Sequence, residues 1–239
     1  EEVPWGTGIY AHNPAQPGQA FYAVTVAVDG EEDFSQLNSG NTTDEPVQET
    51  VGLGIPILQW KETPREWQYR KAAEGSHLNR LIYTRWESWP NASRPSVPID
   101  YLVATATEPL PPDKLREPES RAVRVEPAPV GLHLHCWGGS LNGGYGWWHN
   151  AHRGAVLIAA NQMPYDWWTG YHEALGTCKT WGDGRVHPFT MNRLFDFLDW
   201  ASTQWTNAPE KVRKDWPKLD LTRVFAAGSD ILKVGLVGC

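Results

Sequence analysis

The chain has few cysteines, no long apolar run and no excess of positive charge, and each absence excludes a class of protein. Its three cysteines, Cys136, Cys178 and Cys239, contain no Cys-x-x-Cys pair, which argues against a disulfide framework and a thiolate zinc site. A net charge of −7 makes nucleic acid an unfavourable partner, because a phosphate backbone attracts basic surfaces. No apolar run reaches the roughly 18 residues of a membrane-spanning helix. No signal peptide is visible, since the first residues contain neither a charged region nor an apolar one.

The unusual presence is tryptophan, with 14 Trp residues against 6 Phe. Tryptophan offers a large flat apolar face and one N–H group, so it suits sites that stack on sugar rings or other planar groups. The alternative is that any single Trp fills a gap in the core. The length of 239 residues fits one large domain or two smaller ones.

Residues 1–54 are predicted to form a small all-β module. The run from Ala20 to Val28 is aromatic and β-branched, and the turn signal Asp29-Gly30 follows it. Residues 35–45 are loop-like, and residues 46–51 favour an edge strand. The segment 18–32 resembles the later strands of a fibronectin type III-like module. Because a full module has roughly 100 residues, we expect its first strands to precede residue 1.

Residues 55–125 contain three strand-like runs, at 56–60, 81–86 and 99–105. The last two are separated by a turn-rich connector that begins at Ser88. The connector includes the N-glycosylation triplet Asn91-Ala-Ser93, which is common by chance.

Residues 130–239 change character and favour an α/β fold. Two continuous apolar runs, 130–136 and 154–160, are typical of buried parallel strands. Residues 191–205 have one apolar helical face, with Thr190 as the expected N-cap. A short strand, 224–228, follows, which gives the strand–helix–strand alternation of a parallel sheet. The expected helix face consists of Leu194, Phe195, Leu198, Ala201 and Trp205.

The sequence His135-Cys-Trp-Gly-Gly139 follows the first of these buried strands. It resembles the HGGG-type motif of α/β-hydrolases, whose backbone N–H groups form part of an oxyanion hole. The resemblance implies that the amides near Cys136 and Trp137 stabilise negative charge on the carbonyl oxygen of a substrate. The alternative is a glycine-rich turn that merely fits the sheet.

The segment from Val224 to Asp230 stands where the resemblance places the nucleophile elbow, whose pattern is G-x-S-x-G. One reading frame puts Asp230 in the nucleophile position and the other puts Ser229 there, and neither frame has both glycines. We therefore expect a truncation or frame shift at this point, and no residues downstream to supply the catalytic acid and histidine. The chain is predicted to be inactive, with an unpaired apolar edge at the strand 224–228.

The loop from Asn161 to Glu173 follows the second buried strand and is rich in Trp, Tyr and His. Over about residues 80–230 the chain resembles the polyhydroxybutyrate-depolymerase and feruloyl-esterase-like branch of the α/β-hydrolases, which implies secretion or a periplasmic location. The alternative is a structural loop held by buried aromatic residues. The resemblance implies a substrate site formed by His135, Gln162, Asp166, Trp167, Trp168, Tyr171 and His172.

No metal or cofactor is expected. His172-Glu173 begins like the H-E-x-x-H zinc motif, but Gly176 occupies the second histidine position. The pairs His133/His135 and His149/His152 have no carboxylate or cysteine at ligand spacing, so hydrogen-bonded structural roles are favoured.

The sequence as a whole predicts an α/β fold: an incomplete α/β-hydrolase sheet over residues 55–239, preceded by a partial fibronectin type III-like module over residues 1–54. The function it favours is that of a serine esterase acting on polysaccharide-linked or polymeric esters. The alternative function is a carbohydrate-binding or adhesion module with aromatic platforms and no catalysis. A third possibility, an inactive hydrolase with Asp230 in the nucleophile position, is disfavoured by the missing elbow glycine. The expected partners are an ester or carbohydrate substrate, with no nucleic acid and no membrane.

Overall fold

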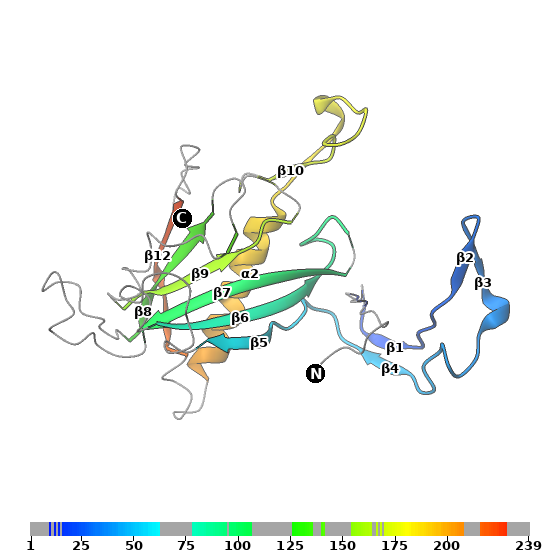
Figure 1. Ribbon diagram of the computed structural model, residues 1–239, viewed down its shortest axis with the longest axis horizontal. Coiled ribbons are helices and arrows are strands. Elements are labelled where there is room, and N and C mark those ends of the chain that lie inside the picture. Colours follow the sequence, from blue (N-terminus) through cyan, green and yellow to red (C-terminus); the bar gives the residue numbers. More distant parts are fainter. Residues whose placement is uncertain are drawn as a thin grey trace, which may run out of the picture.

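The computed structural model describes residues 10, 12, 14, 16–62, 78–94, 96–106, 126–135, 140–141, 154–163, 166, 168, 170–207 and 216–228. These residues form mostly β-structure, with one six-stranded sheet, three two-stranded sheets and one α-helix (Figure 1). In chain order the elements are β1 (Gly18–Ala20), β2 (Val26–Val28), β3 (Glu31–Asp33), η1 (Phe34–Gln36), β4 (Val47–Glu49), β5 (Ile57–Glu62), β6 (Leu78–Glu87), β7 (Val97–Ala106), β8 (Ala128–Leu134), β9 (Val156–Ala160), β10 (Tyr171–His172), η4 (Trp181–Asp183), β11 (Val186–His187), α2 (Phe189–Thr206) and β12 (Leu219–Gly228).

The six-stranded sheet is mixed and has the order β12-β8-β9-β7-β6-β5. The pairs β12–β8 and β8–β9 are parallel, whereas β9–β7, β7–β6 and β6–β5 are antiparallel. The predicted α/β-hydrolase fold class is therefore wrong: the described part of the chain is mostly β and contains one α-helix. The physical reason is that antiparallel strands need no crossover helix, so half of this sheet is built without helices.

The individual strands of this sheet were predicted well. The runs at 56–60, 81–86 and 99–105 correspond to β5, β6 and β7, and the runs at 130–136 and 154–160 correspond to β8 and β9. The pair β6–β7 is the longest, with ten residues of each strand aligned from Leu78 opposite Ala106 to Glu87 opposite Val97. Apolar runs of this kind are reliable signals because both faces of the sheet's centre are buried.

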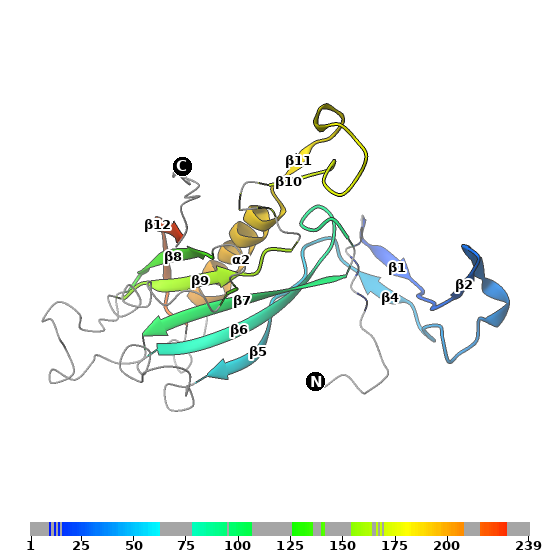
Figure 2. The same ribbon diagram turned by 45° about the horizontal axis from the view of Figure 1, so that its top comes forward.

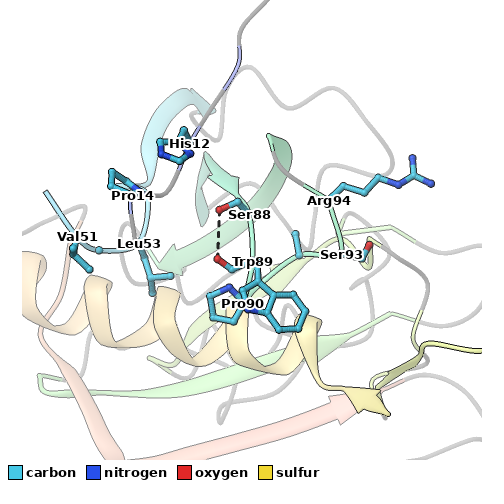
Figure 3. A pocket seen from close by; sticks show the side chains of 11 residues that line it. His12, Pro14, Val51, Leu53, Ser88, Trp89, Pro90, Ser93 and Arg94 are labelled. Carbon is cyan, nitrogen blue, oxygen red and sulfur yellow. Dashed lines mark hydrogen bonds between the residues drawn. The ribbon is translucent and has the colours of Figure 1, made fainter. Parts of the chain in front are cut away.

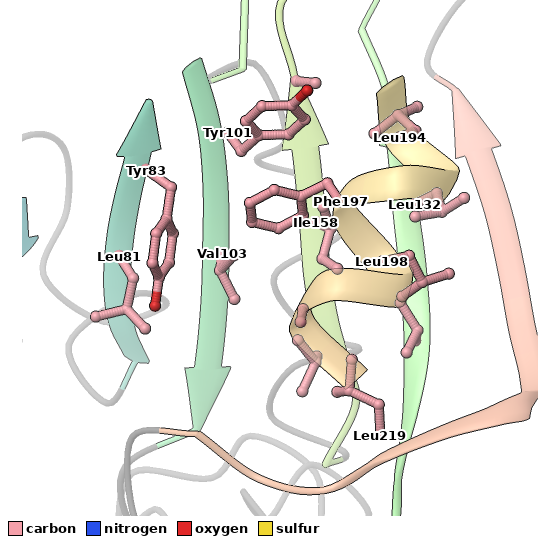
Figure 4. Packing of buried hydrophobic residues seen from close by; sticks show 14 of the residues in the cluster. Leu81, Tyr83, Tyr101, Val103, Leu132, Ile158, Leu194, Phe197, Leu198 and Leu219 are labelled. Atoms are coloured by element: carbon pink, nitrogen blue, oxygen red, sulfur yellow. The ribbon is translucent and has the colours of Figure 1, made fainter. Parts of the chain in front are cut away.

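Helix α2 lies across one face of the sheet and forms the main core with it (Figure 4). Phe197 stacks on Tyr101 with ring centroids 4.2 Å apart, and Leu194 is fully buried beside it. The predicted helical segment is confirmed, but Phe195 is 48 % exposed and Phe197 takes its expected place in the core. No helix among the described residues is long and apolar enough to cross a membrane.

The opposite face of the sheet carries a smaller apolar cluster that includes Leu102, Leu157 and Ala159. On this face the side chains of Leu157 and Phe225 pack closely over Gly131 of β8. A Cβ atom at Gly131 would stand 2.6 Å from the Leu157 Cδ2 atom and 2.8 Å from the Phe225 ring. Glycine is therefore required here for β9 and β12 to pack their side chains over β8.

Residues 16–53 form two ribbons, β1 paired with β4 and β2 paired with β3, beside the large sheet (Figures 1 and 2). The predicted turn is confirmed, because Asp29 and Gly30 have φ angles of 51° and 87° between β2 and β3. The predicted single strand over 20–28 is split into β1 and β2. None of residues 16–53 is buried, so the packed sandwich implied by the fibronectin type III-like resemblance is not formed by these residues.

Candidate functional site

Three parallel strands, β9, β8 and β12, end at the same edge of the large sheet. The register pairs Gly228 at the end of β12 with Leu134 at the end of β8. Ligands of sheets with parallel strands bind beyond the carboxyl ends of those strands. We call Leu134, His135, Ala160 and Gly228, together with the described residues of 161–172, the carboxyl edge.

The sequence-predicted site residues divide into three groups. Cys136, Trp137, Trp167, Ser229 and Asp230 lie outside the described residues. His135, Gln162, Asp166 and Trp168 are buried at the carboxyl edge, whereas Tyr171 and His172 are half-buried in β10.

Trp168 fastens the loop after β9 to the end of β8. Its indole N–H donates a hydrogen bond of 3.0 Å to the backbone oxygen of His135, and the two rings meet edge to face at 5.2 Å. Its backbone has a φ of 62°, a left-handed conformation that costs a non-glycine residue about 1–2 kcal/mol. Strain of this kind is maintained by surrounding contacts and concentrates at functional sites.

Asp166 holds the same loop against helix α2. One carboxylate oxygen accepts from the backbone N–H of Trp168 at 3.1 Å, and the other accepts from the backbone N–H of Thr190 at 3.2 Å. The backbone N–H of Asp166 donates to the side-chain oxygen of Gln162 at 3.4 Å. Asp166 and Gln162 therefore position the loop, and both oxygens of Asp166 are used for this.

The same contact corrects the expected start of the helix. Thr190 is not the N-cap: α2 begins at Phe189 after Pro188, and Thr190 is fully buried. Asp166 supplies the acceptor that an N-cap side chain normally provides, and it does so from another loop.

His133 and His135 alternate with the apolar residues of β8 and are both buried. Neither ring nitrogen of His133 has a hydrogen-bond partner among the described residues. Burial lowers the pKa of His133 to about 4, and the neighbouring His135 contributes to this shift. His133 is therefore neutral at physiological pH. Within the described part of the chain, no three His, Cys, Asp or Glu side chains are grouped as a metal ion would require.

A buried polar network that the sequence analysis missed lies under α2. Arg193 is fully buried and donates to the backbone oxygens of Asn91 at 2.9 Å and Met163 at 2.7 Å. It also donates to the Thr190 hydroxyl at 3.0 Å. Asn91 is itself buried, and its amide donates to Asp196 at 2.5 Å, so the acceptor side chain of the glycosylation triplet is inaccessible in the folded chain. The signal for this network was a charged residue, Arg193, one turn before Phe197 on the apolar stripe of a helix.

A second buried pair supports this network. Arg85 and Glu87 form an ion pair on β6, and the Tyr101 hydroxyl donates to Glu87 at 3.0 Å. Burial raises the pKa of the Glu87 carboxyl, while Arg85 opposes the shift. These contacts fix the end of β6, from which the 88–94 connector begins.

An aromatic row leads from this connector to β10. Trp89 is 62 % exposed and meets the rings of His187 at 5.2 Å and Phe189 at 6.0 Å. Phe189 in turn lies 6.2 Å from the ring of Tyr171. His187 is hydrogen-bonded to Glu173 at 2.5 Å, and this bond lowers the pKa of the Glu173 carboxyl. The connector was predicted only as turn-rich, so Trp89 was missed, although its residue type was the signal.

Comparisons of the chain with protein-family models, with curated proteins and with solved structures found no match. The site is therefore interpreted from its own geometry.

Proposed function

We propose that the carboxyl edge binds a polysaccharide-linked or polymeric ester in a serine-esterase-like arrangement. Acyl transfer needs a nucleophile and backbone N–H donors close to one carbonyl group. In the sequence Ser229 and Asp230 follow β12, and Cys136 and Trp137 follow β8, and these two strands are parallel neighbours.

The observation that carries this proposal is the pairing of Gly228 with Leu134. Neighbouring strands lie about 4.8 Å apart, so groups that follow paired residues on parallel strands begin within reach of one carbonyl group. The bond from Trp168 to His135 brings the loop after β9 to the same place. The ends of β8 and β12 and the described residues of the loop after β9 therefore lie at one edge of the sheet, which supports the proposal.

We further propose that this chain binds the ester without turning it over. The sequence Ala227-Gly-Ser-Asp-Ile231 lacks the pair of glycines that lets an elbow expose its serine. His133, which precedes this edge in β8, has a pKa of about 4 because it is buried. It therefore stays neutral and is a weak base.

The test is to titrate the whole chain with two sugar-free ester probes, ethyl ferulate and a 3-hydroxybutyrate trimer, while monitoring release of free acid. We expect saturable binding without release of acid. Trp168→Phe should weaken binding at least fivefold, because it removes the donor to His135 while keeping an aromatic ring. Saturable hydrolysis by the purified chain would contradict the proposed inactivity, and absence of binding would contradict the ester site.

A second function, carbohydrate binding without chemistry, is favoured by a different observation. Trp89 is 62 % exposed, which is unusual for the largest apolar side chain. Binding of unesterified oligosaccharides, without binding of either ester probe, would favour this second function over the first.

A further inference from the structure

A hollow of about 600 Å³ lies between the N-terminal segment and the 88–94 connector (Figure 3). Residues from both sides line it, including His12 and Leu53 on one side and Ser88, Trp89 and Arg94 on the other. Its volume falls within the range of small-molecule sites, which is about 300–1,000 Å³. The hollow contains none of the residues placed at the carboxyl edge.

Trp89 is exposed in this hollow, yet it is held in place. Its ring packs edge to face against His187 and Phe189. Its loop is closed by the backbone N–H groups of Asn91 and Ala92, which donate to the Ser88 backbone oxygen at 2.8 and 2.9 Å. An exposed aromatic ring whose conformation is fixed beforehand loses little entropy when a ligand stacks on it.

The anchor of this loop is buried. The backbone oxygen of Asn91 accepts from Arg193, and its side-chain amide donates to Asp196. Because Arg193 is fully buried, the connector cannot shift without breaking contacts in the core. The core of the sheet therefore determines the position of Trp89.

The groups around Trp89 match a sugar ring. A pyranose has an apolar C–H face and a rim of hydroxyl groups that both donate and accept hydrogen bonds. Trp89 supplies a flat apolar surface, and Ser93, Arg94 and His12 supply hydroxyl, guanidinium and imidazole groups at its border. Arg94 and His12 cannot form a strong anion site comparable to a cluster of arginines, so a neutral ligand suits the hollow better than a phosphorylated one.

We propose that this hollow binds a sugar unit of a neutral polysaccharide, stacked on Trp89. This inference rests on the proposed function, and ring contacts from Trp89 through the buried Phe189 to Tyr171 join the hollow to the carboxyl edge. In this proposal the alcohol half of the ester is a glycan chain, which is held at the hollow with its ester group directed toward the carboxyl edge.

The test uses neutral, unesterified hexasaccharides of cellulose, xylan, mannan and β-1,3-glucan, titrated calorimetrically into the whole chain. At least one hexasaccharide should bind saturably. Trp89→Ala should lower its affinity tenfold or more, because it removes the flat surface on which the sugar stacks. Trp89→Tyr should retain most of the affinity, because it keeps a flat ring.

Trp181→Ala is the matched control, since Trp181 is equally exposed but packs on His172 in the hairpin that follows β10. It should bind as the unaltered chain does. No binding of any hexasaccharide would overturn the inference, as would equal losses in Trp89→Ala and Trp181→Ala. The sugar-free ester probes report on the carboxyl edge alone, so failure of the ester site and failure of the sugar site give different results.

Discussion

The N-terminal ribbons and the six-stranded sheet have similar strand-forming residues but very different burial. Val24, Val26 and Val28 in the ribbons are 75 %, 62 % and 62 % exposed, whereas Val103 and Val130 in the sheet are fully buried. Burying an aliphatic side chain of this size stabilises a fold by about 1.5–3 kcal/mol. The difference teaches that β-propensity produces a ribbon, whereas a facing helix and neighbouring strands produce a stable core.

The ribbons are held mainly by polar contacts. The side-chain amide of Asn41 donates to the backbone oxygens of Val24 and Gln36, each at 3.1 Å. An isolated two-stranded hairpin is at best marginally stable in water. We therefore expect the cooperative unfolding of this chain to report on the sheet and α2, with little contribution from residues 16–53.

The largest difference in unfolding free energy should appear between two single variants, one that truncates a phenylalanine in the core and one that truncates a phenylalanine in the ribbons. Phe197→Ala should lower the free energy of unfolding by about 3–5 kcal/mol, because it leaves a cavity between Tyr101 and α2. Phe34→Ala, at a residue that is 63 % exposed, should change it by no more than about 0.5 kcal/mol. Urea unfolding followed by circular dichroism measures both. Equal destabilisation by the two variants would show that the ribbons belong to the same cooperative unit.

An intermediate effect should appear on acidification, through His133. The folded-state pKa of about 4 lies below the ordinary 6.5, so below pH 6.5 the unfolded chain binds a proton that the folded chain excludes. The stabilisation is complete above pH 6.5 and is lost as the pH falls toward 4. By pH 4 the loss is about 3 kcal/mol.

His133→Leu removes this titration and should flatten the dependence of unfolding free energy on pH between 7 and 4. The ribbons contribute nothing to it, since His133 lies in β8. If the unaltered chain and the variant lose stability in parallel over this range, the burial of a neutral His133 is not the cause.

The smallest effect should come from removing a tyrosine–glutamate hydrogen bond, which occurs once in the sheet and once in the ribbons. In the sheet the Tyr101 hydroxyl donates to the buried Glu87, and in the ribbons the Tyr22 hydroxyl donates to Glu49 at an exposed position. Tyr101→Phe should cost about 1.5–3 kcal/mol, because it removes a hydrogen bond to a buried charged group. Tyr22→Phe should leave the unfolding midpoint unchanged, because water replaces the hydroxyl.

Titration of the Tyr22 hydroxyl offers an independent check on the ribbon contact. Its hydrogen bond to Glu49 raises the pKa of Tyr22 above the ordinary value. Spectroscopic titration of Tyr22→Phe against the unaltered chain should show the loss of one tyrosine that ionises late. If that tyrosine ionises at the ordinary pH, the contact is not maintained in solution.

Apolar runs predicted the strands of the sheet because burial on both faces leaves a continuous signal in the sequence. Val130 to Leu134 and Val156 to Ala160 carry that signal, and both became central strands. The predicted fold class was wrong because the alternation of strands and helix after residue 130 describes only the parallel half of the sheet. Antiparallel pairing of β5, β6 and β7 leaves no helical signature between strands.

The common edge at which β8, β9 and β12 end could be predicted, because the sequence indicated a parallel arrangement for these strands. The roles of the individual residues could not be predicted. Asp166 accepts a hydrogen bond from the backbone of Thr190 and Trp168 donates one to the backbone of His135, and both partners are distant in the sequence. Trp89 was missed because its position depends on Arg193, which is 104 residues further along the chain.

The capping of α2 by Asp166 has a consequence for the order of assembly. The acceptor for Thr190 comes from a residue 24 positions earlier, so the first turn of α2 is incomplete until the loop after β9 has docked. In hydrogen-exchange experiments the amides of that turn should therefore become protected together with those of the loop, later than the middle of the helix. The first turn of the helix and the loop of the carboxyl edge would mature as a single kinetic unit.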